Sequence, residues 1–178
     1  MRTIRVIPWV LFLVPILLIP DGSAQDLKIN EVQYTNRNTL YDSDNDSPDW
    51  IEIINVSDKS INLSAYQLTD DSTTSIGWNL PNLDLAPDSV MLIFASGKNK
   101  HSMHELHTNF KLNLMEDPVI LMDSKGRILD RIDPQCVPPD ASLGRWPDGS
   151  NALKILTPTP GTSNNSAEVR EIEYVKDS

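Results

Sequence analysis

The densest group of candidate ligands in this chain of 178 residues is an acidic run between positions 42 and 49. It carries aspartates at alternating positions, Asp42, Asp44 and Asp46, and a further one at Asp49. Carboxylates spaced in this way can turn their oxygens to one side of a tight loop, as the opening of an EF-hand loop does around calcium. Asp42, Asp44, Asp46 and Asp49 are therefore candidate ligands of a calcium site.

The rest of the EF-hand pattern is missing from this run. Ser47 stands at the sixth position, where that loop needs glycine, and Ile53 at the twelfth, where it needs a bidentate glutamate. A looser calcium site would need a further ligand, for which Glu31 or Asp71 is the candidate. The alternative is a solvated turn, in which aspartates accept hydrogen bonds from their own backbone. Both interpretations remain open at this point.

The three histidines of the chain, His101, His104 and His107, fall together with Glu105 among them. Imidazole is the commonest transition-metal ligand, and a helix would bring residues at this spacing onto one face. The segment between positions 97 and 110 is instead predicted to be a loop. We therefore expect one hydrogen-bonded structural histidine and two exposed ones; a zinc cluster is the alternative.

Motifs typical of enzymes are missing from the sequence. It contains no Gly-x-Ser-x-Gly elbow, no His-Glu-x-x-His and no glycine-rich phosphate loop. No Ser, His and Asp stand at a spacing that singles out a nucleophile with a base. The sequence predicts no catalytic residues, and no cofactor other than the calcium considered above.

The first 24 residues have the pattern of a secretory signal peptide. Arg2 and Arg5 precede a stretch, from Ile7 to Ile19, that is apolar apart from two prolines, and small residues up to Ala24 follow it. A membrane span needs roughly 20 apolar residues, so the stretch is too short to be one. We expect residues 1–24 to be removed, leaving no membrane span and an exported protein that is secreted, periplasmic or on the cell surface.

The composition excludes one class of partner. The net charge is −10, and it becomes −11 once Arg2, Arg5 and Asp21 leave with the signal peptide. Because nucleic-acid affinity comes mainly from lysine and arginine, we expect no nucleic acid. Cys136 is the only cysteine, so no internal disulfide can form, and we expect it to be a buried or half-buried structural residue.

The elements that would position these residues are short β-strands separated by turns, which is typical of an all-β sandwich. The predicted strands are 27–33, 50–55, 60–63, 66–69, 77–80, 90–95, 119–123, 127–132 and 153–156. The 119–123 and 127–132 strands form the clearest hairpin, with Ile128 and Ile132 expected on the inner face and Asp130 in need of a partner. The predicted core comprises Trp50, Ile53, Leu92, Phe94, Phe110, Ile120 and Ile128, and it also includes Trp78 and Trp146, with Asp49 and Glu52 at its rim.

Five short motifs connect this pattern with a known family. They are Asn30-Glu31-Val32, Asp49-Trp50-Ile51-Glu52, LHTNFKL at 106–112, GRWPDGS at 144–150 and TPTPG at 157–161. In this order they resemble the bacterial secreted branch of the lamin tail domain family, over residues 27–164. The resemblance implies an immunoglobulin-like β-sandwich of two antiparallel sheets. We therefore expect a domain at 25–164, followed by a polar tail at 165–178.

The fold and the predicted export favour a non-catalytic module that binds a protein or has an adhesive or structural role at the cell envelope. The identity of the partner and the oligomeric state are not determined by the sequence. One alternative is a calcium-dependent structural or carbohydrate-binding module, which would use the acidic run and Trp78 or Trp146. A minor alternative is a hydrolase or a hydrolase accessory module.

Overall fold

The computed structural model describes residues 26–102 and 104–170. The predicted signal peptide and residues 171–178 of the predicted tail lie outside the described residues. No helix within the described ranges has the length and hydropathy of a membrane span.

The described chain is built from short strands and two single-turn 3-10 helices. The strands are β1 (Leu27–Gln33), β2 (Asp49–Asn55), β3 (Ile61–Asn62), β4 (Tyr66–Thr69), β5 (Trp78–Asn79), β6 (Asp84–Leu85), β7 (Val90–Ala95), β8 (Lys100–Ser102), β9 (Glu105–His107), β10 (Val119–Asp123), β11 (Ile128–Ile132), β12 (Ser142–Arg145) and β13 (Leu153–Leu156). The 3-10 helices are η1 (Leu63–Ala65) and η2 (Asn164–Ser166).

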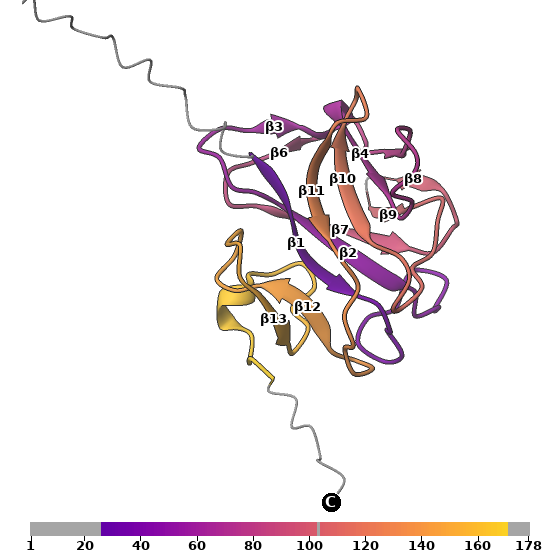
Figure 1. Ribbon diagram of the computed structural model, residues 1–178, viewed down its shortest axis with the longest axis vertical. Helices are drawn as coiled ribbons and strands as arrows, with labels where there is room; N and C mark the ends of the chain where they lie inside the picture. The colour runs from indigo at the N-terminus through magenta and orange to yellow at the C-terminus, as the bar shows by residue number, and fades with distance from the viewer. Residues whose placement is uncertain (1–25, 103, 171–178) are drawn as a thin grey trace, which may run out of the picture.

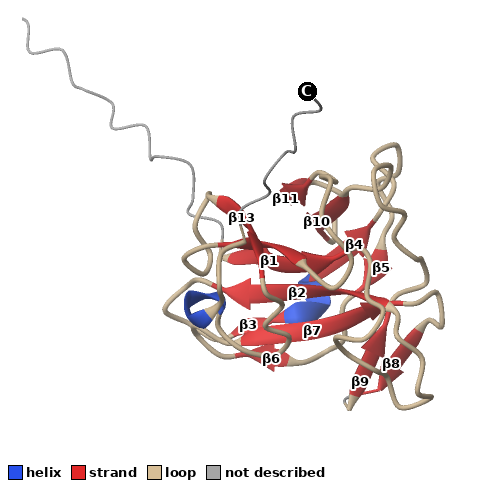
Figure 2. Ribbon diagram, turned by 90° about the horizontal axis from the view of Figure 1, so that it is seen from below, coloured by secondary structure: helices blue, strands red, loops and turns tan. Residues whose placement is uncertain are grey.

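The strands form an immunoglobulin-like β-sandwich, as predicted (Figures 1 and 2). The large sheet has the order β13-β12-β1-β2-β7-β9-β8, and the smaller one β11-β10-β4-β5. Two details differ from two purely antiparallel sheets. The pairing of β7 with β9 is parallel, and β3 with β6 forms a separate two-stranded sheet.

The apolar, β-branched runs are the strands that the sequence locates most sharply. β1, β4, β7, β10 and β13 have the predicted bounds, because alternating or continuous apolar residues stop at turn residues there. The predicted loop at 97–110 contains β8 and β9 instead, which extend from one corner of the large sheet in Figure 2. These strands are short and polar, so they have no hydrophobic period to identify them.

The core lies between the two sheets. The large sheet contributes side chains such as Ile29, Ile51 and Ile53, and the small sheet contributes Leu68 and Leu121, all fully buried. Of the residues predicted for the core, Trp50, Ile53, Phe94 and Ile120 are buried, whereas Leu92 and Phe110 are half-buried.

The prediction that Ile128 belongs to the core is wrong, because its side chain is 52% exposed. A β-bulge is the cause: Leu121 pairs with Asp130, but Met122 pairs with Ile128, which leaves Leu129 as an extra residue. One extra residue reverses the facing of every side chain beyond it. Leu129 therefore packs against the core in place of Ile128, while Ile132 stays buried.

Asp130 has the partner that its position requires. Its carboxylate accepts hydrogen bonds from Arg145 Nη2 at 2.7 and 2.9 Å and from the Ile29 N–H at 2.9 Å. Arg145 Nε donates to the Ile29 carbonyl at 2.8 Å. This buried ion pair satisfies the backbone of Ile29, next to the irregularity that separates Ile29 from Glu31 in the β1–β2 pairing.

Three other burial predictions need correction. Trp78 is buried, but Trp146 is 39% exposed and is not a core residue. Cys136 is exposed rather than buried. Glu52 does not lie at a rim, since its side chain is fully buried on the face of β2 that also carries Trp50.

The C-terminal part of the described chain stays against the large sheet. After η2, the Glu168 carbonyl accepts a hydrogen bond from the Thr157 N–H, and the Arg170 N–H donates to the Ile155 carbonyl. Residues 168–170 of the predicted tail thus lie along β13.

Candidate binding site at one end of the sandwich

The acidic run lies at the end of the sandwich where β1 ends and β2 begins. Gln33 pairs with Trp50, and Asp49 pairs with Ala95, so the ends of β1 and β7 meet the start of β2. The loop from β1 to β2 and the turn after β7 are therefore neighbours. This juxtaposition brings the acidic run to residues that follow β7.

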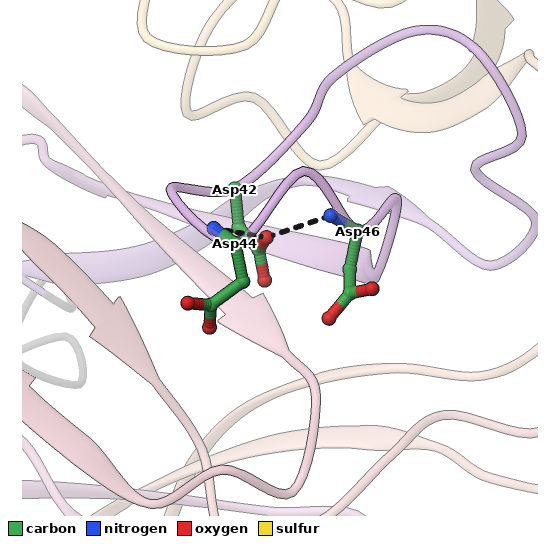
Figure 3. A group of neighbouring side chains, drawn as sticks. All are labelled: Asp42, Asp44 and Asp46. Carbon is green, nitrogen blue, oxygen red and sulfur yellow. Dashed lines mark hydrogen bonds between the residues drawn. The ribbon is translucent and has the colours of Figure 1, made fainter.

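Asp42 organises the acidic loop. Its Oδ1 accepts hydrogen bonds from the Asp44 N–H at 3.0 Å and the Asp46 N–H at 2.9 Å (Figure 3). Asn45 has a φ of 63°, which asparagine tolerates in a tight turn. The self-bonded turn expected as an alternative is therefore present. It also places one carboxylate oxygen of Asp42, Asp44 and Asp46 within 4.8 Å of one another.

An ammonium group lies among these carboxylates. Lys98 Nζ is 2.5 Å from Asp42 Oδ2, 2.7 Å from Asp44 Oδ2 and 2.8 Å from Asp46 Oδ2. Lys100 Nζ is a further 2.9 Å from Asp44. The hydrogen bond from Lys98 lowers the pKa of Asp44 to about 2, and the carboxylates raise the pKa of Lys98. Two ammonium groups of this chain thus offset most of the negative charge of the three carboxylates.

Asp49 lies apart from the other three aspartates. Its Oδ1 accepts a hydrogen bond from the Asn36 N–H at 2.9 Å, and burial raises its pKa to about 6. The two candidates for an extra ligand are engaged elsewhere, Glu31 with Ser142 and Thr159, and Asp71 with Thr73. The fold brings together Asp42, Asp44 and Asp46 only.

A chain of hydrogen bonds connects the acidic loop to the sheet through His107. Glu105 accepts from the Ser43 N–H at 2.6 Å and lies 2.6 Å from His107 Nε2. His107 Nδ1 is 2.8 Å from Ser96 Oγ. The imidazole is fully buried and stacks on Phe94 with ring centroids 5.2 Å apart. His107 therefore joins three segments of the chain.

The other two histidines do not join His107 in a cluster. His101 stacks on Trp78 with ring centroids 4.6 Å apart, and His104 is exposed. Among the described residues, Asp42, Asp44 and Asp46 are the one group of potential metal ligands that lie this close together. The described residues give no support to the zinc alternative.

A comparison with protein families relates this arrangement to known sequences. The family model described as Lamin Tail Domain matches residues 20–135, more than half of the chain. The chain belongs to the lamin tail domain family. A search of curated proteins found no match. The family's domain is immunoglobulin-like, in agreement with the sandwich. Strands β12 and β13 lie after the matched range, but they belong to the large sheet, which also contains β1 and β2.

Next to the acidic loop, this lamin tail domain has an open pocket of about 390 Å³. Its walls come from the end of the acidic loop, the end of β7 and the segment that pairs with it through a Ser96–Lys111 bridge. The lining residues are Asp46, Ser47, Pro48, Asp49, Ala95, Ser96, Lys98, Lys111 and Leu112. The pocket lining therefore includes two residues with carboxylates, two with ammonium groups, and the apolar residues Pro48, Ala95 and Leu112.

Sequence reasoning missed Lys98, Lys111 and Ser96 as residues of this site. Lys98 stands 56 positions from Asp42, and no local pattern indicates that they meet. The motif at 106–112, quoted above for its resemblance to the family, contains both His107 and Lys111. That motif was the one available signal.

Proposed function

We propose that this lamin tail domain is an exported, non-catalytic module that binds a protein partner at the bacterial cell envelope. The observation that carries the proposal is the pocket between the acidic loop and the end of β7, with charges of both signs in its walls. A partner segment with paired acidic and basic side chains would complement it, because charge complementarity favours specific association. An immunoglobulin-like module of this family is compatible with such a binding or structural role.

The one serine and histidine pair in the site supports a binding role over catalysis. Ser96 Oγ already accepts the Lys98 N–H at 3.1 Å, as in an ordinary serine turn. The imidazole beside it is fully buried and held by Glu105. Ser96 lines the pocket, but a hydrolase would also need its imidazole to exchange a proton with the substrate, and this imidazole has no exposed surface.

Filling the pocket tests the proposal. Ser47→Trp places an indole at the pocket wall from a half-buried position outside the core. The matched control is Ser124→Trp in the exposed turn after β10, at the opposite end of the sandwich from Asp49. Captures from bacterial cell-envelope extract should yield a partner with the wild type and the control but not with Ser47→Trp. Equal capture by all three would overturn the assignment of the pocket.

Export is tested separately. N-terminal sequencing of the protein recovered outside the cytoplasm should begin at Gln25 if residues 1–24 are a cleaved signal peptide. Recovery of the full-length chain from the cytoplasm alone would contradict export.

A second candidate function is a calcium-dependent structural or carbohydrate-binding module. It is favoured by the closeness of the Asp42, Asp44 and Asp46 oxygens, although calcium must first displace Lys98. A carbohydrate would stack on Trp146, which is partly exposed, rather than on Trp78. Calorimetric titration with calcium decides the first part: no heat and an unchanged melting temperature at millimolar ion would exclude it.

A further inference from the structure

Two glutamates are buried side by side on the face of the large sheet that points away from the core. Glu31 of β1 pairs with Glu52 of β2, and both side chains are fully buried. Cross-strand partners on one face lie close enough to interact directly. The residues that bond to their carboxylates include Thr159 and Gly161, which follow β13. Residues 157–164 are called the strap below; they lie beside β12 and β13, in yellow, in Figure 1.

The sequence of the strap limits where its backbone donors can go. Pro158 and Pro160 have no N–H, so within residues 157–161 the alternating prolines leave backbone donors at Thr157, Thr159 and Gly161. The Thr157 N–H bonds to Glu168, within the C-terminal segment. The Thr159 N–H lies 3.1 Å from Glu31 Oε1, and the Gly161 N–H lies 2.7 Å from Glu52 Oε2. The two donors that face the sheet thus both bond to carboxylates.

A third carboxylate holds the far end of the strap. Asp148 Oδ1 accepts hydrogen bonds from the Asn164 N–H and from Asn30 Nδ2, each at 2.9 Å, and Asp148 Oδ2 accepts one from Ser163 Oγ. The fully buried Asn164 side chain donates to the carbonyls of Asn30 and Arg145 at 3.1 and 3.0 Å. Glu31, Glu52 and Asp148 are called the carboxylate cluster below.

The side of Gly144 that faces this cluster has no space for a larger residue. A Cβ there would lie 2.9 Å from Asn164 Nδ2 and 3.4 Å from Glu31 Cγ. The strap and the sheet are therefore in close contact over the cluster.

The carboxylate cluster has no cation among its described hydrogen-bond and ion-pair partners. Arg145 of β12 turns its guanidinium to Asp130, and Lys28 of β1 donates to the Gly149 carbonyl. Lys154 of β13 lies opposite Gly144 and is exposed. The strap and β7, whose Leu92 lies opposite Glu52, contribute no titratable side chain.

Burial without a cation disfavours ionisation of the glutamates. Burial raises the pKa of Glu52 to about 8, with a smaller contribution from Glu31, although the Gly161 N–H opposes it. Burial also raises the pKa of Glu31, against the hydrogen bonds from Ser142 and Thr159.

We propose that the carboxylate cluster is a pH-sensitive latch, which holds the strap on the sheet while Glu31 and Glu52 keep a proton and releases it once both are ionised. Two adjacent anions in a buried site repel each other and lack solvation, and lifting the strap gives both carboxylates access to water. Release would uncover the outer face of β1 and β2, and it would free β13 from residues 168–170. The strap would then be a conformational element controlled by pH, with residues distinct from those that line the pocket beyond the end of β1.

Amide hydrogen exchange on the full chain tests the latch at the backbone N–H groups that donate to the carboxylate cluster. The reporters are the N–H groups of Thr159, Gly161 and Asn164, each bonded to one carboxylate of the cluster. Their protection factors, corrected for intrinsic exchange, are compared with that of Ile53 in the core. We expect them to fall by roughly tenfold per pH unit as pH rises toward the Glu52 pKa of about 8 and to level off above it, while the Ile53 amide keeps its protection.

Glu52→Gln is the decisive variant, because an amide cannot ionise while its oxygen can still accept from Gly161. In this variant the three amides should keep their protection up to pH 9. Glu116→Gln is the control for the loss of one negative charge, since Glu116 is exposed and far along the chain from the cluster. It should behave like the wild type. If Glu52→Gln does not fold, Glu31→Gln replaces it with the same expected result.

Three results would overturn the latch. They are pH-independent protection in the wild type, a loss in Glu52→Gln equal to that of the wild type, and a loss shared by Ile53, which would indicate global unfolding.

Discussion

The acidic loop and the carboxylate cluster each gather three carboxylates, but their surroundings have opposite effects. In the loop, Asp42, Asp44 and Asp46 surround the ammonium group of Lys98 at the surface. In the cluster, Glu31 and Glu52 accept hydrogen bonds from neutral donors only and are fully buried. The pKa of Asp44 is accordingly lowered to about 2, whereas that of Glu52 is raised to about 8.

The comparison shows that a high density of acidic residues in the sequence does not indicate where charge is unfavourable. Aspartates close together in a turn can share a lysine and remain in contact with water. A single glutamate in a strand can be enclosed by a distant segment that brings no cation. Four substitutions would test or sharpen this contrast.

The largest effect is expected where a buried carboxylate does have a cation. The Arg145 and Asp130 side chains are 7% and 11% exposed and form one ion pair. Arg145→Met leaves Asp130 buried without its partner, and such losses cost about 3–5 kcal/mol. Urea unfolding at pH 7 measures this change. A decrease in the free energy of unfolding below about 1 kcal/mol would mean that a buried carboxylate here tolerates the absence of a cation. The proposed difference between the acidic loop and the carboxylate cluster would then be wrong.

The next effect concerns the pH dependence of stability. The pKa of Glu52 is about 8 in the folded chain and near 4.5 in the unfolded one. Between these two pH values the Glu52 carboxyl is protonated in the folded state but ionised in the unfolded state. Its contribution to the stability of the fold is therefore complete below pH 4.5 and is lost as pH rises through 8. The raised pKa of Asp49, about 6, also makes the fold less stable as pH rises, but over a lower pH range.

Urea unfolding of the wild type should accordingly show a free energy that falls by about 1 kcal/mol per pH unit between pH 6 and 8. In Glu52→Gln this slope should be markedly smaller, because only the contribution of Glu31 remains, and the variant should be more stable than the wild type at pH 8. A wild type whose stability rises with pH over this window would show that Glu52 is ionised in the folded state.

A smaller effect is expected from Lys98→Met at the acidic loop. The variant removes the ammonium group from three carboxylates, of which that of Asp42 is inaccessible to solvent. The melting temperature should fall, by less than in Arg145→Met, because water reaches Asp44 and Asp46. Millimolar calcium should restore it in the variant. Failure of calcium to restore it would exclude the loop as a calcium site.

The smallest effect is expected from Asp44→Asn. The Asp44 side chain is 53% exposed, and Lys98 keeps its bonds to Asp42 and Asp46. Differential scanning calorimetry should show an unchanged melting temperature, since surface ion pairs contribute little. A decrease as large as that of Lys98→Met would mean that Asp44 is the main partner of Lys98.

The sequence predicts most of the architecture, and its failures have local causes. The β1 and β7 bounds follow from apolar residues that end at turns, and the self-bonded turn at Asp42 follows from aspartate chemistry. Ile128 was misplaced because the bulge at Leu129 leaves no mark on the hydrophobic pattern. The edge strand β8 was missed because polar residues in a short strand have no period to detect.

The sequence by itself determined that this chain forms strands, where most of them lie, and that a Thr-Pro-Thr-Pro-Gly strap has few backbone donors. These properties depend on neighbouring residues, through side-chain alternation and the missing N–H of proline. Only the tertiary structure decided which carboxylates receive a cation. Lys98 reaches Asp42 across 56 positions, and Thr159 covers Glu31 across 128. The energy of a carboxylate depends on its solvation and on charges within a few ångströms, and the fold alone sets both.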